Sequence, residues 1–380
     1  MHDGGGAVAA VPLLGHVQAS VDQPAPRQLW HDLDMAPPPL ALLHDHLDGG
    51  LRVETVIELA DEIGWRLPSA DAEDLAAWFT AGAGAGDILQ YLATFEHTIA
   101  VMQTEAALER VAYEAVIDLA SDGVVYAEVR FAPELHQEQG LSIEAVVTAV
   151  TSGFARGETD ATAQGSGITV GAILCAMRTE QRSTEIARAA AELRTTNQRV
   201  WGFDLAGAET GFAPSMHAEA LALARSELLN ITIHASEPPD LELITDALDH
   251  GAHRIGHGVR LQSDLRLTDG EVTDLGPVAQ YVLDRQIHLE MAPTCHVQIG
   301  AVERLEQHPI IPMLRAGFNV GVNTDNRLMS AVMPSTELAA LDAIFELTAT
   351  EQRRLTQNAI RAGFAPHAER QRILHTLDLA

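Results

Sequence analysis

The residues best suited to metal chemistry lie in one short stretch, Leu43 to Gly49, which reads LHDHLDG. His44 and His46 stand two positions apart at the end of a run typical of a β-strand. Side chains at i and i+2 of a strand share a face, so both imidazoles would point to the same place, as ligands of one metal ion must. A His-x-His pair alone is weak evidence, because polar residues at a strand end are common.

Further metal-competent residues follow three later β-like runs. His234 ends the run ITIH, His257 ends RIGH, and Asp325 follows VGVNT. Each taken singly is better explained as a turn residue. Their joint placement after strands predicts a catalytic zinc or iron site of imidazoles, a carboxylate and a water. The other histidines, His308 among them, lack this placement and are predicted to be core or surface residues.

Eight β-like runs alternate with helical patterns, which is typical of repeated βα units and a parallel sheet. Eight units predict an α/β fold, a closed (β/α)8 TIM barrel, whose reacting groups lie at the carboxyl ends of the strands. The predicted strands are 41–46, 123–131, 168–176, 199–205, 231–235, 253–257, 287–292 and 318–324, and helical patterns between them include 142–155, 184–193, 214–229 and 276–285.

Three segments fall outside this alternation. The long connection between the first two strands holds helical patterns at 51–63, 88–102 and 105–119 and a glycine-rich turn at 81–86, and we expect its extra helices to cover the barrel mouth as a lid. Residues 335–379 predict a helical C-terminal tail packed outside the barrel. Residues 1–38 predict a disordered N-terminal arm, which leaves residues 39–380 as a single metal-dependent domain.

The charged residues exclude several classes of function. The 24 basic residues are all arginines. Schiff-base aldolases, pyridoxal phosphate enzymes, phosphate-binding loops and metal sites bridged by a carboxylated lysine all need a lysine, so the sequence excludes them. A net charge of −29 opposes binding to nucleic acid or to an anionic membrane surface.

The cysteines and the apolar segments indicate the compartment. Cys175 and Cys295 lie in separate apolar runs and suggest no disulfide framework. They also cannot supply the Cys-x-x-Cys zinc motif of cytidine deaminases. No stretch approaches the roughly 20 apolar residues of a membrane span, and the apolar run near the N-terminus has no basic residue before it. We therefore expect a cytoplasmic protein.

Five motifs together resemble the adenosine deaminase family, within the amidohydrolase superfamily of metal-dependent barrels. The resemblance runs in order from about residue 42 to about residue 362, and the combination of motifs is highly specific. Its carriers are HDHLDG at 44–49, FDLAGAE at 203–209, IHASE at 233–237, RIGHG at 254–258 and VNTD at 322–325.

The resemblance implies a metal centre and three catalytic residues. Zn²⁺ would lower the pKa of a bound water from about 15.7 toward roughly 7 and so make hydroxide available for attack on purine C6. Glu237 would donate a proton to purine N1, and a dry pocket would raise its pKa for that role. His257 would act on the water as a base or electrostatically, while Asp325 orients it. The implied metal ligands are His44, His46, His234 and Asp325.

The implied substrate contacts are His46, Asp48, Gly207 and Asn326. Gly207 would offer its backbone N–H to purine N3, and its lack of a side chain would allow close approach. Asp48 would hold a ribose hydroxyl, which favours a nucleoside over a free base. The implied reaction is hydrolytic deamination of adenosine or 2′-deoxyadenosine to inosine or 2′-deoxyinosine and ammonia. The expected partner is a small purine nucleoside, and the sequence predicts no oligomeric state.

Three positions depart from the family pattern. Asn326 replaces an aspartate that contacts purine N7, and its amide can donate without a raised pKa. Ser236 replaces glycine, at a cost of about 1–2 kcal/mol if the position needs a positive φ. His296 replaces asparagine and is expected at the pocket rim. Two alternatives stay open: a deaminase of another 6-aminopurine or modified nucleoside, and a non-catalytic zinc-binding relative, which the presence of Glu237 and His257 opposes.

Overall fold

Eight parallel strands make the central sheet of this computed structural model, which describes residues 38–86 and 88–379. The sheet order is β1-β2-β3-β4-β5-β6-β9-β10. All eight predicted strands are confirmed, with ends that differ by a few residues. The strands are β1 (Leu40–His46), β2 (Val124–Phe131), β3 (Thr169–Met177), β4 (Val200–Ala206), β5 (Asn230–Ala235), β6 (Arg254–His257), β9 (His288–Met291) and β10 (Val320–Val322).

The sheet closes into a barrel where the chain beyond β10 meets β1. Asp45 pairs with Asp325 in a parallel bridge. The backbone N–H of His46 donates to the carbonyl of Asp325 at 2.7 Å, and the N–H of Asp325 donates to the carbonyl of His44 at 3.0 Å. Asn323 ends β10 earlier than predicted, because its side-chain oxygen accepts from the N–H groups of Leu43 and His44 at 2.8 and 3.0 Å.

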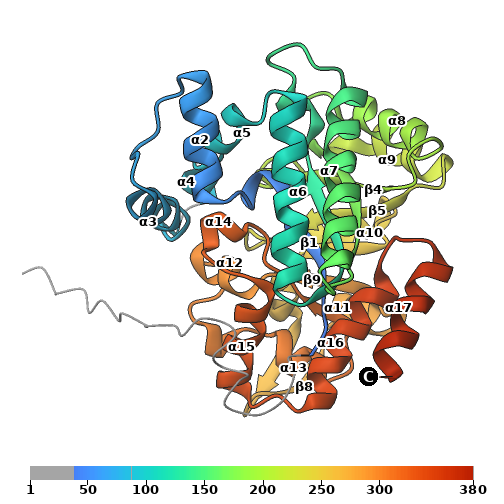
Figure 1. Ribbon diagram of the computed structural model, residues 1–380. Helices are drawn as coiled ribbons and strands as arrows, with labels where there is room; N and C mark the ends of the chain where they lie inside the picture. Colours follow the sequence, from blue (N-terminus) through green and yellow to red (C-terminus); the bar gives the residue numbers. More distant parts are fainter. Residues whose placement is uncertain (1–37, 87, 380) are drawn as a thin grey trace, which may run out of the picture. The chain divides into compact units, whose positions relative to one another are not determined.

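Helices surround the barrel, and several of them are inserted between β1 and β2 (Figure 1). The α-helices are α2 (Val53–Ile63), α3 (Ala72–Ala83), α4 (Ile88–Ala93), α5 (Phe95–Val101), α6 (Glu105–Ser121), α7 (Ile143–Ala163), α8 (Ser183–Leu193), α9 (Ala218–Ser226), α10 (Glu242–Asp249), α11 (Pro277–Arg285), α12 (Pro293–Gln298), α13 (Ile310–Arg315), α14 (Arg327–Ser330), α15 (Pro334–Phe345), α16 (Ala349–Ala362) and α17 (His367–Leu379). Short 3₁₀ helices are η1 (Leu47–Gly49), η2 (Pro133–His136), η3 (Pro214–His217), η4 (Val259–Asp264) and η5 (Leu305–Gln307).

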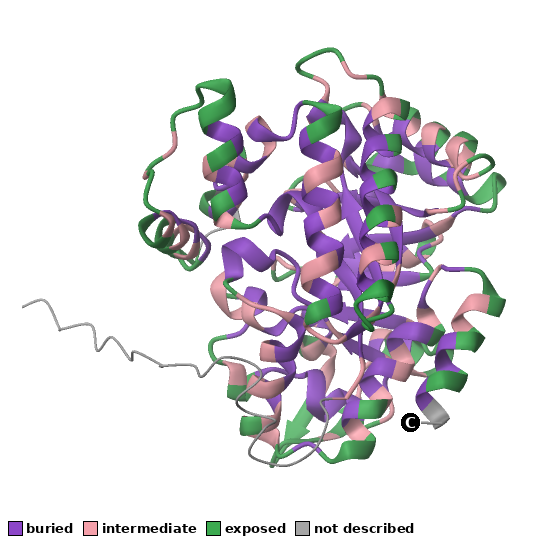
Figure 2. Ribbon diagram, viewed as in Figure 1, coloured by how far each residue is buried: buried purple, intermediate pink, exposed green. Residues whose placement is uncertain are grey.

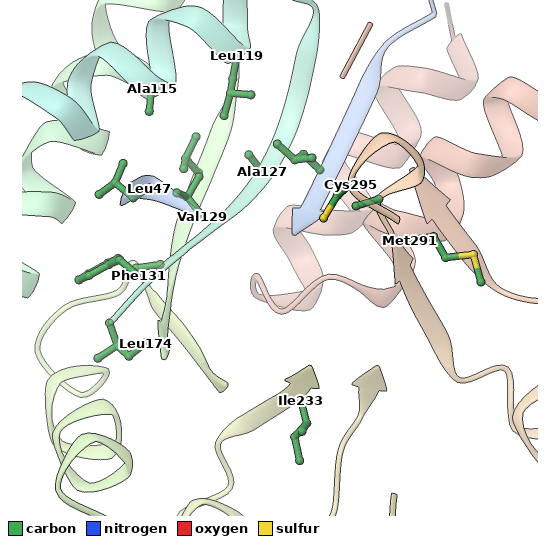
Figure 3. Close-up of a cluster of buried hydrophobic side chains, with 14 of the residues drawn as sticks. Leu47, Ala115, Leu119, Ala127, Val129, Phe131, Leu174, Ile233, Met291 and Cys295 are labelled. Atoms are coloured by element: carbon green, nitrogen blue, oxygen red, sulfur yellow. The ribbon is translucent and has the colours of Figure 1, made fainter. Parts of the chain in front are cut away.

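The main core lies between the strands and the surrounding helices. Ala115 and Leu119 of α6 and Ala127 and Val129 of β2 belong to one buried cluster (Figure 3). Figure 2 shows exposed residues along α6 and α7, whereas the strands behind them are buried. Because both faces of a parallel sheet are covered, its strands are apolar almost throughout, as in β3.

The connection from β1 to β2 differs from the prediction in two ways. A helix, α3, occupies residues that had no helical prediction; Asp71 caps it by accepting from the N–H groups of Glu73 and Asp74. The glycine-rich turn therefore begins only at Gly84. In addition, α6 is not a lid helix, because it packs beside α7 and against β2 as a helix of the outer ring (Figure 1). Parallel neighbours such as β1 and β2 need a crossover connection, which is usually such a helix.

A small antiparallel hairpin between β6 and α11 was not predicted. Its strands, β7 (Leu265–Thr268) and β8 (Glu271–Leu275), pair only with each other. The turn residues Asp269 and Gly270 both have positive φ, 53° and 80°, which is the conformation that an Asp-Gly hairpin turn requires.

The predicted helical C-terminal tail is confirmed. It consists of α15, α16 and α17, and α16 packs against β1 and β10. Ile360 of α16 and Ile373 of α17 share a buried cluster with Tyr126 and Trp201. No helix among the described residues is long and apolar enough to cross a membrane. The predicted N-terminal arm, through residue 37, lies outside the residues that the structure describes.

Candidate active site

A cavity of about 320 Å³ lies at the carboxyl ends of the barrel strands. Strand ends contribute residues to its lining, and the helices inserted after β1 contribute others, including Tyr91 and Phe95. The lid prediction is therefore confirmed for α4 and α5. The predicted site residues that line the cavity are His46, Asp48, Gly207, His234, Glu237, His257, Asp325 and Asn326.

Four of the predicted residues form a group that could hold a metal ion. One ligand atom from each of His44, His46, His234 and Asp325 lies within 4.8 Å of all the others. His46 Nε2 is 3.1 Å from His234 Nε2, and Asp325 Oδ1 is 3.3 Å from His44 Nε2. His44 Nε2 is buried without a hydrogen-bond partner. A metal ion would satisfy this nitrogen, so the residues fit such an ion.

Carboxylates lie behind two of the imidazoles and fix which nitrogen faces the cluster. Glu290 Oε2 is 2.9 Å from His44 Nδ1, and Asp204 Oδ2 is 3.0 Å from His234 Nδ1. Arg130 bridges these carboxylates, at 2.6 Å from each. Burial alone would raise the pKa of Glu290, but Arg130 and Arg254 hold it at about 2. An anionic partner on Nδ1 leaves Nε2 free as a metal ligand.

Backbone strain is concentrated at the strand ends that carry the site. Ser236, His257 and Asp325 have φ values of 69°, 61° and 58°, in the left-handed region that residues other than glycine rarely occupy. Such strain persists where the surrounding structure fixes it, commonly at functional sites. The position of Ser236 does need a positive φ, so the Cβ of this serine costs about 1–2 kcal/mol there. Its hydroxyl is also buried without a hydrogen-bond partner.

Glu209 holds the loop that carries Glu237. Its carboxylate accepts from the N–H of Ser236 at 2.7 Å and from the N–H of Glu237 at 3.2 Å. Burial raises the pKa of Glu237 well above its usual value, and the negative charges of Glu209 and Asp325 add to this. Glu237 Oε1 lies 3.6 Å from His257 Nε2. Glu209 is the last residue of the motif FDLAGAE, but its contact with this loop was not predicted from the sequence.

We expect Ser236→Gly to increase the free energy of unfolding by about 1 kcal/mol, because glycine removes the strain of the positive φ and the unsatisfied hydroxyl. Urea denaturation would measure this gain. Because Glu209 holds both N–H groups of the loop, we expect kcat to rise only slightly. Glu346→Gly is the matched control, since Glu346 has φ 50° on the surface far from the cavity. A loss of stability in Ser236→Gly would contradict the assignment of strain.

The other predicted residues also face the cavity with unused polar groups. Asp48 Oδ1 is buried without a partner, and burial raises the pKa of Asp48 to about 7. Gly207 has φ 93°, and a Cβ there would come within 2.9 Å of Met177 Cε. Asn326 Nδ2 donates to the Tyr91 hydroxyl at 2.8 Å, which leaves one amide hydrogen for a ligand. Tyr91 belongs to none of the motifs in the sequence and was not predicted as a site residue.

His296 does not lie at the pocket rim, as the sequence had suggested. It is fully buried on α12 behind His257 and does not line the cavity. Its Nε2 is 3.0 Å from His257 Nδ1, and its Nδ1 is 2.9 Å from His308 Nε2. The position was misjudged because α12 begins at Pro293 and turns the side chain back under the barrel mouth. Its neighbour Cys295 donates from Sγ to Asp325 Oδ2 at 2.9 Å.

Comparisons with known proteins agree with this geometry. Residues 39–380 match the family model described as adenosine deaminase. The chain is 46% identical to an adenosine deaminase of Mycobacterium leprae (strain TN) over 338 residues, which cover 88% of this chain and 93% of the relative. It is 48% identical to an adenosine deaminase of Mycobacterium sp. (strain KMS) over 335 residues, 87% of this chain and 92% of the relative.

A solved structure shares the barrel. The crystal structure of an adenine deaminase from Arthrobacter aurescens superposes with a TM-score of 0.78 at 29% identity and covers 90% of this chain and 98% of its own. With a family model that matches nearly all described residues, the chain belongs to the adenosine deaminase family.

Proposed function

We propose that this protein hydrolytically deaminates adenosine and 2′-deoxyadenosine, giving inosine or 2′-deoxyinosine and ammonia, with one Zn²⁺ per chain. The observation that carries the proposal is one cavity that brings the four metal-competent residues together with the carboxyl group of Glu237, whose side chain is only 10% exposed. A zinc site supplies a water of lowered pKa, and an acid beside it can assist departure of the 6-amino group.

The chain's own residues would divide the chemistry as follows. His44, His46, His234 and Asp325 would hold the metal. Glu237 would keep a proton, because burial favours its neutral form, and would donate it to purine N1. Protonation at N1 draws electrons from C6 and so favours attack there. His257, whose Nε2 lies 3.6 Å from Glu237 Oε1, would act on the attacking water.

The substrate contacts would select a nucleoside. The buried, unpartnered Asp48 Oδ1 suits a ribose hydroxyl. The backbone of Gly207 would meet purine N3, and the remaining amide hydrogen of Asn326 would meet N7, with His46 beside the reacting carbon. Among the described residues, the cavity lining contains no arginine. A phosphate group would therefore find no arginine in the lining to compensate its charge.

The proposal extends to the protein as a whole. Residues 39–380 would act as one deaminase domain, the span that the family model matches. A cytoplasmic location is supported by two buried cysteines that are both free. The proposed partner is a small purine nucleoside, and neither nucleic acid nor a membrane surface, in keeping with the net charge of −29.

A kinetic panel with the zinc-loaded protein tests this function, together with metal analysis of the same sample. We expect turnover of adenosine and 2′-deoxyadenosine, measured as a loss of absorbance, with a higher kcat/KM than for adenine or for AMP. Adenine should be the poorer substrate because it has no ribose hydroxyl for Asp48 to bind. AMP should be the poorer substrate because the cavity lining has no arginine to pair with its phosphate. Higher kcat/KM for adenine would favour the activity named for the Arthrobacter relative. No turnover of any 6-aminopurine would overturn the proposal.

A further inference from the structure

A hydrogen-bonded chain of three buried histidines leads away from the cavity, and the donor and acceptor of each bond in it can be assigned. His257 Nδ1 lies 3.0 Å from His296 Nε2, and His296 Nδ1 lies 2.9 Å from His308 Nε2. At the far end, the backbone N–H of Ile310 donates to His308 Nδ1 at 3.2 Å. The exposed fractions of the three residues are 1%, 0% and 1%, so water does not compete for these bonds.

The backbone amide sets the direction, because an amide nitrogen can only donate. His308 Nδ1 must accept, so the proton of a neutral His308 is on Nε2 and is donated to His296. His296 Nδ1 then accepts, and its own proton is on Nε2, where it is donated to His257. By the same step His257 accepts at Nδ1 and carries its proton on Nε2. The opposite order would bring two N–H donors together at His308 and Ile310.

Burial supports neutral rings at His296 and His308. It lowers the pKa of His308 to about 3. Burial and the neighbouring His308 lower the pKa of His296 well below its usual value. The rings of His296 and His308 are nearly parallel, with an angle of 4° between their planes, so the shared hydrogen bond can lie close to both ring planes.

We propose that His296 and His308 are positioning residues that, through the backbone N–H of Ile310, hold His257 in the tautomer with its proton on Nε2. This inference rests on the proposed deaminase function and deepens it. His257 then meets the cavity as a hydrogen-bond donor and stabilises negative charge on the oxygen that attacks C6. In this tautomer Nε2 has no lone pair with which to take a proton from water, so the choice between a base and an electrostatic role is decided for the latter.

Nitrogen NMR of the zinc-loaded protein labelled with ¹⁵N-histidine tests the proposal directly. We expect Nδ1 of His257 to resonate in the unprotonated, pyridine-like range and Nε2 in the protonated, pyrrole-like range; the spectrum of His257→Asn assigns the signals. His296→Gln keeps an N–H donor near the place of Nε2 and should preserve the His257 pattern. His296→Leu removes the donor and should give His257 a mixture of tautomers.

Kinetics of the same variants provide the second readout. His296→Leu should lower kcat by about 10- to 100-fold, the usual effect of losing a partner that orients a site residue, with little change in KM because His296 does not line the cavity. His296→Gln should restore most of the loss. His288→Leu is the control, since His288 is also buried but lies at the first residue of β9, at the opposite end of the barrel.

The outcomes separate this inference from the proposed function. A His257 protonated on Nδ1 in the wild type, or equal kcat for His296→Leu and wild type, would overturn the positioning role. If the zinc-loaded protein deaminates no purine, the deaminase proposal fails, but the NMR pattern still decides the tautomer. A Leu variant that unfolds would be recognised by circular dichroism, and the wild-type spectrum together with His296→Gln then decides alone.

Discussion

Glu237→Gln is expected to lower kcat for adenosine by about 10²- to 10⁴-fold, the range in which a positioned proton donor contributes. The amide keeps the size of the side chain and can still donate a hydrogen bond to purine N1, but it cannot transfer a proton. In free-energy terms the loss corresponds to about 2.7–5.4 kcal/mol of activation, at 1.36 kcal/mol for each tenfold change. KM should change much less, because the cavity keeps its shape.

The same role for Glu237 predicts how kcat changes with pH. Burial raises the pKa of Glu237 well above its usual value, and the neutral carboxyl is the form that donates. The wild-type kcat should therefore be highest below the raised pKa and decline as pH rises through it. Since Gln does not titrate, the variant should lose this decline at high pH.

Glu337→Gln is the matched control. Glu337 is 1% exposed, and burial raises its pKa to about 7, but it does not line the cavity. Its replacement should leave kcat and the pH profile of kcat as they are in the wild type. Wild-type kcat in Glu237→Gln would remove this carboxyl group from the mechanism and would move the proton donor to another residue.

The sequence predicted the metal-competent cluster because each of its members follows a simple local rule. His44 and His46 share a strand face, and their ring centroids lie 5.4 Å apart. His234 and Asp325 are almost 100 residues apart in sequence, yet both follow barrel strands, whose ends converge. The rule that the strand ends of a barrel converge therefore located the site from the sequence, before any distance was known.

The charged network under the cluster follows no such rule. Arg130, Asp204 and Glu290 are charged residues in the buried strands β2, β4 and β9, and only closure of the barrel brings their side chains together. The signal in the sequence was the presence of charged residues in buried strands, because a buried charge needs a partner. Which charges are partners depends on strand order and stagger, which the sequence pattern does not contain.

The misjudged segments have physical reasons of the same kind. His296 lies on the short helix α12 and His308 directly follows η5, twelve positions later, so their contact depends on how the chain between them turns. The helix α3 carries a capping aspartate and apolar residues at Leu75, Phe79 and Ala83, four positions apart, but Gly82 and the glycines that follow the helix obscured the pattern. A helical pattern alone also does not say whether the helix covers the barrel mouth or its side, as α6 shows.

Arg130→Met is expected to have the largest effect on stability, because it removes the cation shared by two buried carboxylates. Asp204 and Glu290 are both 0% exposed, and each lies 2.6 Å from the guanidinium group of Arg130. The guanidinium also donates to the carbonyl of Leu43 at 2.7 Å. Breaking a buried ion pair on one side typically costs about 3–5 kcal/mol. Urea unfolding of the metal-free protein would measure this loss.

The same substitution should weaken metal binding by about 10- to 100-fold, since partners behind metal-ligating histidines commonly contribute that much. Without Arg130, Asp204 and Glu290 repel each other and hold the rings of His234 and His44 less firmly. Competition with a chelator would measure the affinity. Arg199→Met is the control, because Arg199 pairs with Glu158 at 2.7 Å in a partly exposed position, where a pair contributes at most about 1 kcal/mol.

A second substitution identifies the cause of the expected loss. In the Arg130→Met background, Glu290→Gln removes one of the two carboxylate charges that Arg130 balances, while its side-chain oxygen can still accept from His44 Nδ1. The double variant should therefore recover part of both the stability and the metal affinity. Were Arg130 needed only to fill space, Glu290→Gln would restore neither, and Arg130→Met would bind metal as the wild type does. Recovery in the double variant would instead assign to Arg130 the balance of charge on which the orientation of both histidines depends.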